Sequence, residues 1–468
     1  MSRFNNLAKA RPRSEPQVTT VIPHSEPVAK AGASIDSARP FPAFRSAPEQ
    51  PNILATAGFF VFCLYITSGY LNEWALRYFG GKAYISTVAL FLLPVIWLIC
   101  GNAFRGLRHP IGLWWVGFLV LMLIATPFSI WRSGSVTMLG NYIPRSFLMF
   151  FYIAAFATSL ARCRSLTFLN IAAGAFVLLS CFKLGDYSDD GRFFVSGSLF
   201  FTNSNELALT LLLGATQFGF LFFRRGIGKR VIGVAGILVS IMYMLKTGSR
   251  GCMLAAFCVC FLMFIVSRNK VIVLLLAIPV FAIAFLALPV ATKQRLMSLG
   301  FDTVPVSASE ASAVGSQMER EELFKRSLKE TLIHPLVGVG PGQFAVAVAG
   351  ESMKRGEWAP WLGTHNSYTQ VSSECGIPAF ICYCAVIGWC FRLNYRLYRR
   401  TRYEPALTEI AGMSFCLLAA TVVYSVATIF FHMAYSGNLP SLAGLSLAVH
   451  FSGKSLLEQA QRQAVMTV

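Results

Sequence analysis

Four side chains have the types and settings of a phosphate-handling site. Arg192, Arg250 and Arg320 each stand beside a polar or glycine-rich segment. His365 lies in the run THNSYTQVSSECGIPAF at 364–380. A planar guanidinium binds oxygens in pairs and keeps its charge, and a histidine titrates near neutral pH, where it suits the work of a general base. Together these residues predict a site for a phosphorylated ligand beside a tunable base.

Each of these side chains also has an ordinary structural interpretation. For Arg250, in the segment KTGSRGCMLA, the alternative is an interfacial anchor at a helix end. Arg192 precedes Asn203 and Asn205, a composition that is typical of helix capping. A lone histidine is more often structural than catalytic. The functional interpretation therefore depends on the fold bringing the four residues to one face of the molecule.

The segment 317–332 predicts an amphipathic helix with Arg320 inside its apolar stripe. At 100° per residue, Leu323, Phe324, Leu328 and Thr331 all fall within about 80° of Arg320. A charge in such a stripe must be paired or hydrated, which makes it a candidate site residue. The alternative is that Arg320 snorkels from the edge of the stripe to water or to lipid phosphate. Both interpretations stay open at this point.

Two further segments frame His365. The run HPLVGVGPGQF at 334–344 contains Gly340 and two other glycines, so it predicts either a plain turn or a loop whose amides cradle phosphate. It lacks the GK[ST] ending of a P-loop. Asn366 follows His365 and predicts a helix cap, and Glu374 lies farther along the same segment.

The elements that position these residues are predicted to be transmembrane helices. The chain has 468 residues, of which 55% are hydrophobic and 13% charged, with a mean hydropathy of +0.58. Soluble domains carry about 25% charged residues. Apolar runs near 20 residues recur, and each is long enough to cross roughly 30 Å of hydrocarbon as a helix. The fold class is therefore an all-α polytopic membrane protein with about 12 transmembrane helices. The predicted spans are 53–71, 83–101, 111–130, 143–160, 166–184, 205–223, 231–245, 251–267, 271–291, 374–391, 410–431 and 439–453.

Charge in the short loops predicts the orientation of the chain. Lys and Arg concentrate in alternate short loops, which favours cytoplasmic placement of those loops and of both termini. This topology, rather than a nucleic-acid partner, explains the net charge of +19. It places an outlying segment of about 80 residues on the outer face of the membrane. The predicted order is a disordered cytoplasmic tail (1–50), an N-terminal bundle of about nine helices (51–291), a large periplasmic loop containing helices (292–373), C-terminal transmembrane helices (374–453) and a cytoplasmic tail (454–468).

The cysteines are not spaced as metal ligands. Eleven of the twelve lie in or beside apolar segments, and none of their spacings is typical of a paired CxxC site or a secreted disulfide framework. They are interpreted as small hydrophobic side chains. We expect no metal and no cofactor.

The motifs together resemble the O-antigen ligase and O-antigen polymerase superfamily. The matching pieces are SRG at 249–251, the Arg320 helix running into HPLVGVGPGQF, and the HNSY...E.G.P run from His365 to Pro378. The FTNSNELA segment with Asn205 is a looser match. With the topology, the resemblance covers roughly residues 50–453.

The resemblance implies a GT-C-like, inverting and metal-independent glycosyltransferase of the bacterial inner membrane, acting in lipopolysaccharide or exopolysaccharide biosynthesis. The glycan would pass from an undecaprenyl-diphosphate carrier to lipid A-core or to a growing polysaccharide at the periplasmic face. Arg250 and Arg320, with Arg192, would grip the diphosphate, and His365 would orient or deprotonate the acceptor hydroxyl. Asn366, Gly340, Asn205 and Glu374 would support the site. The family often has an aromatic residue such as Trp after the loop arginine, where this chain has Leu323 and Phe324.

Other classes of protein fit parts of the same pattern. A transporter or flippase of lipid-linked saccharides would also hold a diphosphate in a basic cavity, although it predicts charges near mid-membrane and two related halves with broken helices. A non-catalytic component of a polysaccharide export complex would make the cluster incidental. Ligase and polymerase share their chemistry, and other polysaccharide-assembly proteins are expected partners in either case.

Overall fold

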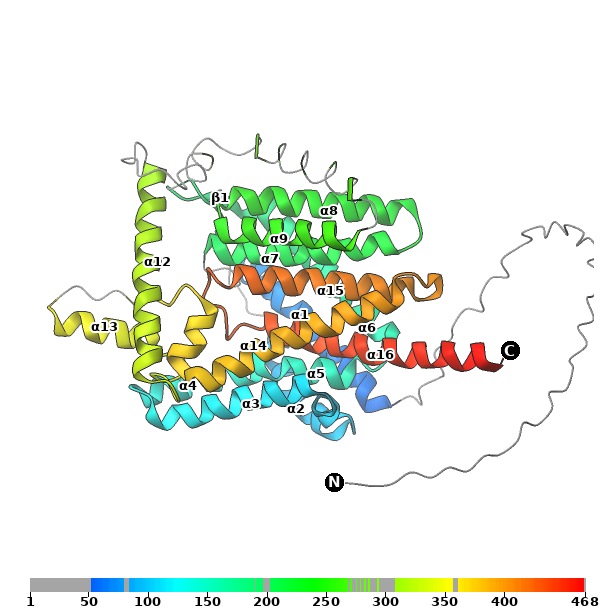
Figure 1. The fold of residues 1–468 in the computed structure, drawn as a ribbon, viewed down its shortest axis with the longest axis horizontal. Helices are drawn as coiled ribbons and strands as arrows, with labels where there is room; N and C mark the ends of the chain where they lie inside the picture. Colours follow the sequence, from blue (N-terminus) through cyan, green and yellow to red (C-terminus); the bar gives the residue numbers. More distant parts are fainter. Residues whose placement is uncertain are drawn as a thin grey trace, which may run out of the picture. The chain divides into compact units, whose positions relative to one another are not determined.

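The chain folds into a bundle of long helices (Figure 1). The computed structural model describes residues 52–79, 84–189, 191–196, 203–267, 308–356 and 361–466, together with isolated residues between 270 and 293. Of the predicted segments, the N-terminal tail and most of the span 271–291 lie outside the described residues. Within the described part, the strands form one two-stranded antiparallel hairpin, β1 (Gly185–Tyr187) with β2 (Phe193–Val195), in which Gly185 faces Val195.

The α-helices and the short 3₁₀ and π elements alternate with tight loops. The α-helices are α1 (Ile53–Phe79), α2 (Ile85–Ile99), α3 (Pro110–Ala125), α4 (Arg132–Tyr142), α5 (Met149–Phe156), α6 (Leu160–Leu184), α7 (Ser204–Phe218), α8 (Ile227–Lys246), α9 (Arg250–Val266), α12 (Ala308–Ile333), α13 (Phe344–Lys354), α14 (Ser367–Thr401), α15 (Thr408–Ala427) and α16 (Asn438–Met466). The short elements are η1 (Ala103–Arg108), η2 (Thr126–Phe128), η3 (Ile143–Phe147), η4 (Gly219–Phe223) and η5 (Pro405–Leu407).

The described helices include seven that are long and apolar enough to cross a membrane, and α2 and α9 are shorter apolar helices. The predicted number of about twelve spans is therefore not confirmed. The predicted span 143–160 is interrupted, because Pro144 lacks an amide hydrogen and lies in the π turn that separates α4 from α5. At the other end, α16 continues through the segment predicted as the cytoplasmic tail, up to Met466.

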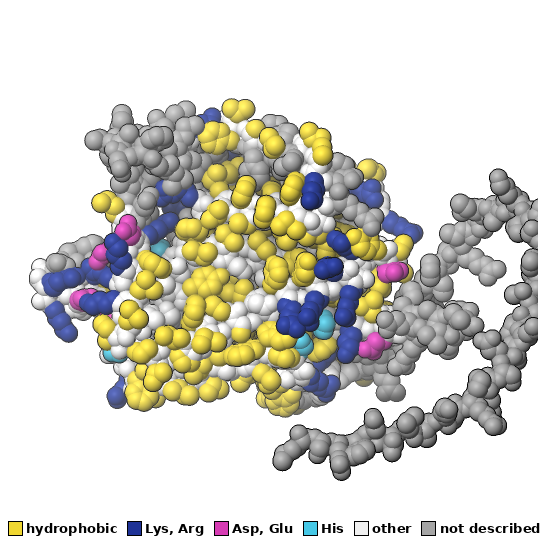
Figure 2. Space-filling model, viewed as in Figure 1, with side chains coloured by type: hydrophobic (Ala, Val, Ile, Leu, Met, Phe, Trp, Pro, Cys, Tyr) yellow, Lys and Arg dark blue, Asp and Glu magenta, His cyan; other side chains and the backbone are white. Residues whose placement is uncertain are grey.

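Packing places α15 at the centre of the bundle. In the apolar segment that ends with α15, 78% of the residues are buried, against 22% in α8. The helix contacts α7, α9, α14 and α16. Outer helices expose apolar side chains instead, such as Phe91 of α2 and Phe257 of α9. Figure 2 shows such side chains gathered over the middle of the visible face. An exposed apolar surface of this extent belongs against lipid, so the protein is an integral membrane protein.

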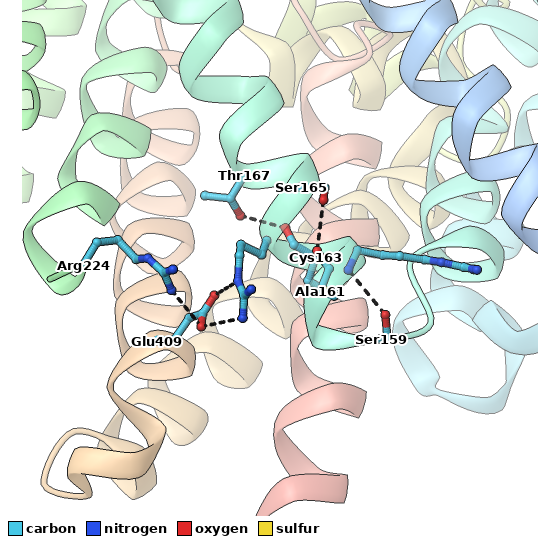
Figure 3. A network of polar contacts seen from close by, with 9 residues as sticks. Ser159, Ala161, Cys163, Ser165, Thr167, Arg224 and Glu409 are labelled. Carbon is cyan, nitrogen blue, oxygen red and sulfur yellow. Dashed lines mark hydrogen bonds and ion pairs between the residues drawn. The ribbon is translucent and has the colours of Figure 1, made fainter. Parts of the chain in front are cut away.

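Polar contacts join the loops at one end of the bundle. Glu409, in the first turn of α15, binds Arg224 at 2.8 Å and also forms an ion pair with Arg164 of α6 (Figure 3). Arg402, after α14, donates to the carbonyl of Val266 at the end of α9 at 3.3 Å. These are loops that the charge pattern places on a single side of the membrane.

Candidate active site at the start of α14

His365 lies in a strained turn immediately before α14. Asn366 caps the helix, because its Oδ1 accepts hydrogen bonds from the amides of Tyr368 at 2.8 Å and Thr369 at 3.1 Å. The φ of His365 is +48°, and it is the only positive φ of a non-glycine residue in the described part of the chain. Strained backbone of this kind concentrates at functional sites. The cap thus fixes a half-buried imidazole at the mouth of the bundle.

The loop between α15 and α16 is tied to the same turn. The Ser367 hydroxyl donates to the carbonyl of Phe431 at 2.6 Å and accepts from the amide of Met433 at 2.8 Å. The amide of Ser367 donates to the carbonyl of Thr428 at 2.9 Å. These bonds set the ring of His432 against that of His365, with 5.1 Å between the centroids and an interplanar angle of 80°.

The start of α7 completes a small pocket around the two imidazoles. Asn203 caps α7 by accepting hydrogen bonds from the amides of Asn205 and Glu206, each at 3.0 Å. Side chains from three chain segments line the pocket: Asn203, Asn205, Glu206, His365, Phe431, His432 and Met433. The pocket therefore presents amide, carboxylate and imidazole groups together.

Arg192 holds the wall of this pocket to the start of α9. Its Nη2 donates to Oδ1 of Asn205 at 2.6 Å, and its Nε donates to the carbonyl of Thr247 at 3.0 Å. Arg250 begins α9 three residues after Thr247. A Cβ on Gly251 would lie 2.6 Å from the ring of Phe430, so the start of α9 packs closely against the loop that carries His432. The predicted residues Arg192, Asn205 and Arg250 thus lie on segments that adjoin His432.

Arg320 lies in the buried face of α12. Leu323, Ser327 and Thr331 are 3%, 0% and 7% exposed, and Arg320, half-buried, shares their side of the helix. Phe324 and Leu328 are about 40% exposed. The buried face is therefore centred nearer Leu323 than the apolar stripe in the sequence predicts. Thr331 shares a hydrogen bond of 2.8 Å with Ser372 of α14, so this face packs toward α14.

The charge of Arg320 acts on His365. Burial, the His432 ring and Arg320 lower the pKa of His365 to about 4. Burial also lowers the pKa of His432, and Glu206 opposes that shift. Both imidazoles are therefore neutral near pH 7, and each has a ring nitrogen that can accept a hydrogen bond. The Nδ1 of His432 is buried with no hydrogen-bond partner among the described residues.

The glycine-rich loop after α12 is fastened to α14 by its own amides. Glu374 accepts hydrogen bonds from the amides of Gly342 at 2.9 Å and Phe344 at 3.3 Å, and from the hydroxyl of Tyr435 at 2.7 Å. The amide of Gly340 donates to the carbonyl of Glu374 at 2.9 Å. These donors are occupied by protein, which favours the turn interpretation of HPLVGVGPGQF over a phosphate cradle. Glu374 and Gly340 thus hold the loop against α14, and their support of the site stays a prediction.

A break in α14 receives the same loop. Gly376 has a φ of +83°, and a Cβ there would lie 2.3 Å from the carbonyl oxygen of Leu336. The amide of Ile377 donates to the carbonyl of Pro335 at 2.7 Å. The loop therefore fills the gap in the helix, which only a glycine at this position permits.

The middle of the chain carries a family signature. A sequence-family model described as O-antigen ligase matches residues 235–384 of the chain. This segment therefore resembles O-antigen ligases. The finding confirms the resemblance to the O-antigen ligase and polymerase superfamily that the motifs suggest. No curated protein sequence matches the chain.

The O-antigen ligase match contains three of the four residues that were proposed to handle the ligand, namely Arg250, Arg320 and His365. Arg192 and Asn205 precede the matched segment, and His432 follows it. Within the described residues, no three His, Cys, Asp or Glu side chains are grouped to hold a metal ion.

Sequence reasoning missed His432 and Glu206 as members of this pocket. His432 stands in the segment FFHMAYSGN between two predicted spans, on the side of the membrane to which the charge pattern assigns His365. That placement was the available signal. Glu206 follows the Asn-rich start of α7, but nothing in the local sequence shows that α7 packs beside the last two helices.

Proposed function

We propose that the protein transfers a glycan from a lipid diphosphate carrier to the hydroxyl of a sugar acceptor, as a ligase or a polymerase. The observation that carries this proposal is the setting of His365. His365 is a neutral imidazole in a strained turn, beside the ring of His432 and within the electrostatic influence of Arg320. It is therefore able to accept a hydrogen bond from a hydroxyl. The family match over residues 235–384 supports the same chemistry.

In the proposed reaction, the acceptor hydroxyl attacks the anomeric carbon of the donor glycan. The new C–O bond forms as the bond to the diphosphate breaks, and the lipid diphosphate leaves with the bonding electron pair, which inverts the anomeric centre. Arg320 and Arg250 stabilise the charge on the leaving diphosphate, without a metal ion. Arg192 keeps Asn205 and the start of α9 in place, as its two hydrogen bonds indicate.

His365 orients the acceptor and receives its proton. An imidazole with a pKa of about 4 is a weak base. The hydroxyl proton becomes strongly acidic as the C–O bond forms, and the negative diphosphate raises the basicity of a nearby imidazole. We therefore assign His365 first to positioning the hydroxyl and then to accepting the proton late in the reaction.

The proposed setting is the bacterial inner membrane, with the site at the periplasmic face. The donor is an undecaprenyl-diphosphate-linked glycan, and the acceptor is lipid A-core or a growing polysaccharide. The bundle supports this choice because the pocket lies at the end of α14 opposite its arginine-rich C-terminal turns, and arginine-rich loops remain on the cytoplasmic side.

The proposal is tested with purified protein reconstituted with a carrier-linked repeat unit. We expect a longer glycan or a glycan on lipid A-core, and we expect His365→Ala to lower the rate by roughly 10²- to 10⁴-fold. His334→Ala is the matched control, because His334 is exposed, lies at the end of α12 and takes no part in the pocket. Equal rates for the His365 variant and wild type would refute the assigned role. Carrier-linked glycan that crosses the bilayer without forming a new glycosidic bond would indicate a transporter instead.

A further inference from the structure

A second polar site lies at the other end of α14, in a groove between α14 and α16. Its cavity has a volume of about 730 Å³. Three arginines of α14, namely Arg392, Arg396 and Arg400, line one wall, and Lys454 of α16 lines the other. Nothing in the proposed glycan transfer uses these side chains.

Helix geometry turns these cations toward one space. Arg392, Arg396 and Arg400 are spaced four residues apart and therefore lie on one face of α14. On α16, His450 and Lys454 have the same spacing and face them across the groove. The two helices are held together by Asn394, which donates a hydrogen bond of 2.8 Å to Ser446. This bond fixes the two helices relative to each other, and the exposed side chains of Arg392, Arg396, Arg400 and Lys454 extend from them.

The groove has far more positive than negative charge. The one carboxylate in its lining, Glu458, lies 3.8 Å from Lys454. Within the part of the chain that the structure describes, no carboxylate forms an ion pair with Arg392, Arg396 or Arg400. Like charges that converge in a concave site repel one another and attract an anion.

The retention of arginines on the cytoplasmic side does not by itself require that arginines line a common groove. Two other arginines at this end of the bundle, Arg164 and Arg224, share the carboxylate of Glu409 (Figure 3). Retention of arginines on the cytoplasmic side works through their number, not through a common concave wall. The groove arginines differ from this pair, because among the described residues no carboxylate is shared between them.

Aromatic and apolar side chains complete the groove. The guanidinium of Arg392 lies 5.0 Å from the ring centroid of Trp389, whose ring has an edge-to-face contact of 5.0 Å with His109. Leu393 and Leu457 also line the groove. Tryptophan is enriched at the level of lipid headgroups, and a basic pocket between helices with apolar walls suits a headgroup that has acyl chains attached.

We propose that this groove binds the phosphate of an anionic glycerophospholipid, such as phosphatidylglycerol or cardiolipin, with the acyl chains lying along its leucine side. Free inorganic phosphate is also an anion, but it has nothing to place on the apolar walls. The phospholipid therefore binds more tightly than phosphate does, and the site is separate from the pocket at His365.

Binding is measured by native mass spectrometry and thermal unfolding of the full chain in detergent, with phosphatidylglycerol, phosphatidylcholine or inorganic phosphate added. We expect phosphatidylglycerol alone to bind and to raise the unfolding temperature. Arg396→Gln should weaken this binding about fivefold, the effect of one basic residue near an anionic headgroup. Arg392→Gln should do the same, which keeps the test sharp if one variant folds poorly.

Arg399→Gln is the matched control. Arg399 is on the same helix and has the same charge, but it lies outside the groove lining and over the ring of Tyr395 at 5.8 Å. It should bind phosphatidylglycerol as wild type does. Equal affinity for phosphatidylcholine, or equal loss in the Arg399 and Arg396 variants, would overturn the proposal. If inorganic phosphate produced the same rise in unfolding temperature as phosphatidylglycerol, the ligand would be a free anion, and this result would also overturn the proposal.

Discussion

At the scale of single residues, the central feature is the pairing of two neutral imidazoles under a guanidinium charge. His365 was predicted from the sequence as a site residue, because it opens a helix on the outer face on which the charge pattern also places a cluster of arginines. Its partner His432 was not predicted. The two histidine segments are joined by the hydrogen bond from the amide of Met433 to the hydroxyl of Ser367, and these two residues are 66 positions apart in the sequence. The contact of the rings depends on tertiary structure alone.

The pKa of His365 should respond to the charge of Arg320. The ring is neutral above about pH 5 because its pKa is lowered to about 4. Burial and the His432 ring are the larger causes of this shift and remain in Arg320→Gln, so removing the charge should raise the pKa only slightly, since a nearby positive charge disfavours the protonated ring. The measurement is a titration of the His365 ring by NMR of labelled protein in micelles. A pKa unchanged by this substitution would show that Arg320 does not act on His365.

Arg320→Lys should lower glycan transfer by roughly 10²-fold, because one ammonium does not replace two parallel N–H donors on a developing oxyanion. Steady-state assays of the reconstituted protein measure the effect. Arg326→Lys on the same helix is the control, since a lysine there keeps the charge that pairs with Glu322. If the two variants retained the same activity, the fork of Arg320 would have no role in the reaction.

At the scale of elements, capping chemistry was predictable and packing was not. Asn203 and Asn366 cap α7 and α14 as their sequence context indicates, because a side-chain oxygen beside a helix start meets free amides locally. The buried face of α12 departs from the predicted stripe, because Ser327 and Thr331 pack inward by hydrogen bonding, which hydropathy does not register. The predicted span 143–160 also differs from the structure, because Pro144 lies in a π turn.

The glycine-rich loop should tolerate no side chain at Gly340. A Cβ there would lie 2.1 Å from the Ser129 hydroxyl, and the φ of +109° is unfavourable for any other residue. Gly340→Ala should therefore lower stability by roughly 1–3 kcal/mol. Thermal unfolding in detergent measures this loss. Gly350→Ala in α13 is the control, since its Cβ meets nothing within 4 Å, and alanine is favoured there by up to about 1 kcal/mol. The prediction fails if the two variants unfold at the same temperature.

At the scale of the whole molecule, the charge pattern predicted which loops lie at the same end of the bundle, while the predicted number of spans stays unconfirmed. Loops assigned to one side contact one another at each end of the bundle, as Arg192 with Thr247 and Arg224 with Glu409 show. The length rule for spans misleads where a helix is short, as in α9, or where it extends far beyond its apolar part, as in α16.

The proposed function requires that α13 and His365 lie outside the cytoplasm. A membrane-impermeant maleimide should label Lys354→Cys in intact cells with a permeable outer membrane, and should label Lys229→Cys only after lysis. Both lysines are exposed in the structure. Wild-type protein gives the background from its twelve cysteines. The reverse labelling pattern would exclude a periplasmic reaction.

The loop seated in the break of α14 limits how the pocket can admit a substrate. Because Leu336 and Pro335 occupy the gap at Gly376, the two halves of α14 cannot bend or straighten there without ejecting that backbone and breaking its bond to Ile377. The loop between α12 and α14 therefore keeps the angle of the break in α14 rigid. In the proposed reaction, movement that admits a bulky donor is therefore expected in the other segments that line the pocket, the start of α7 and the segment between α15 and α16.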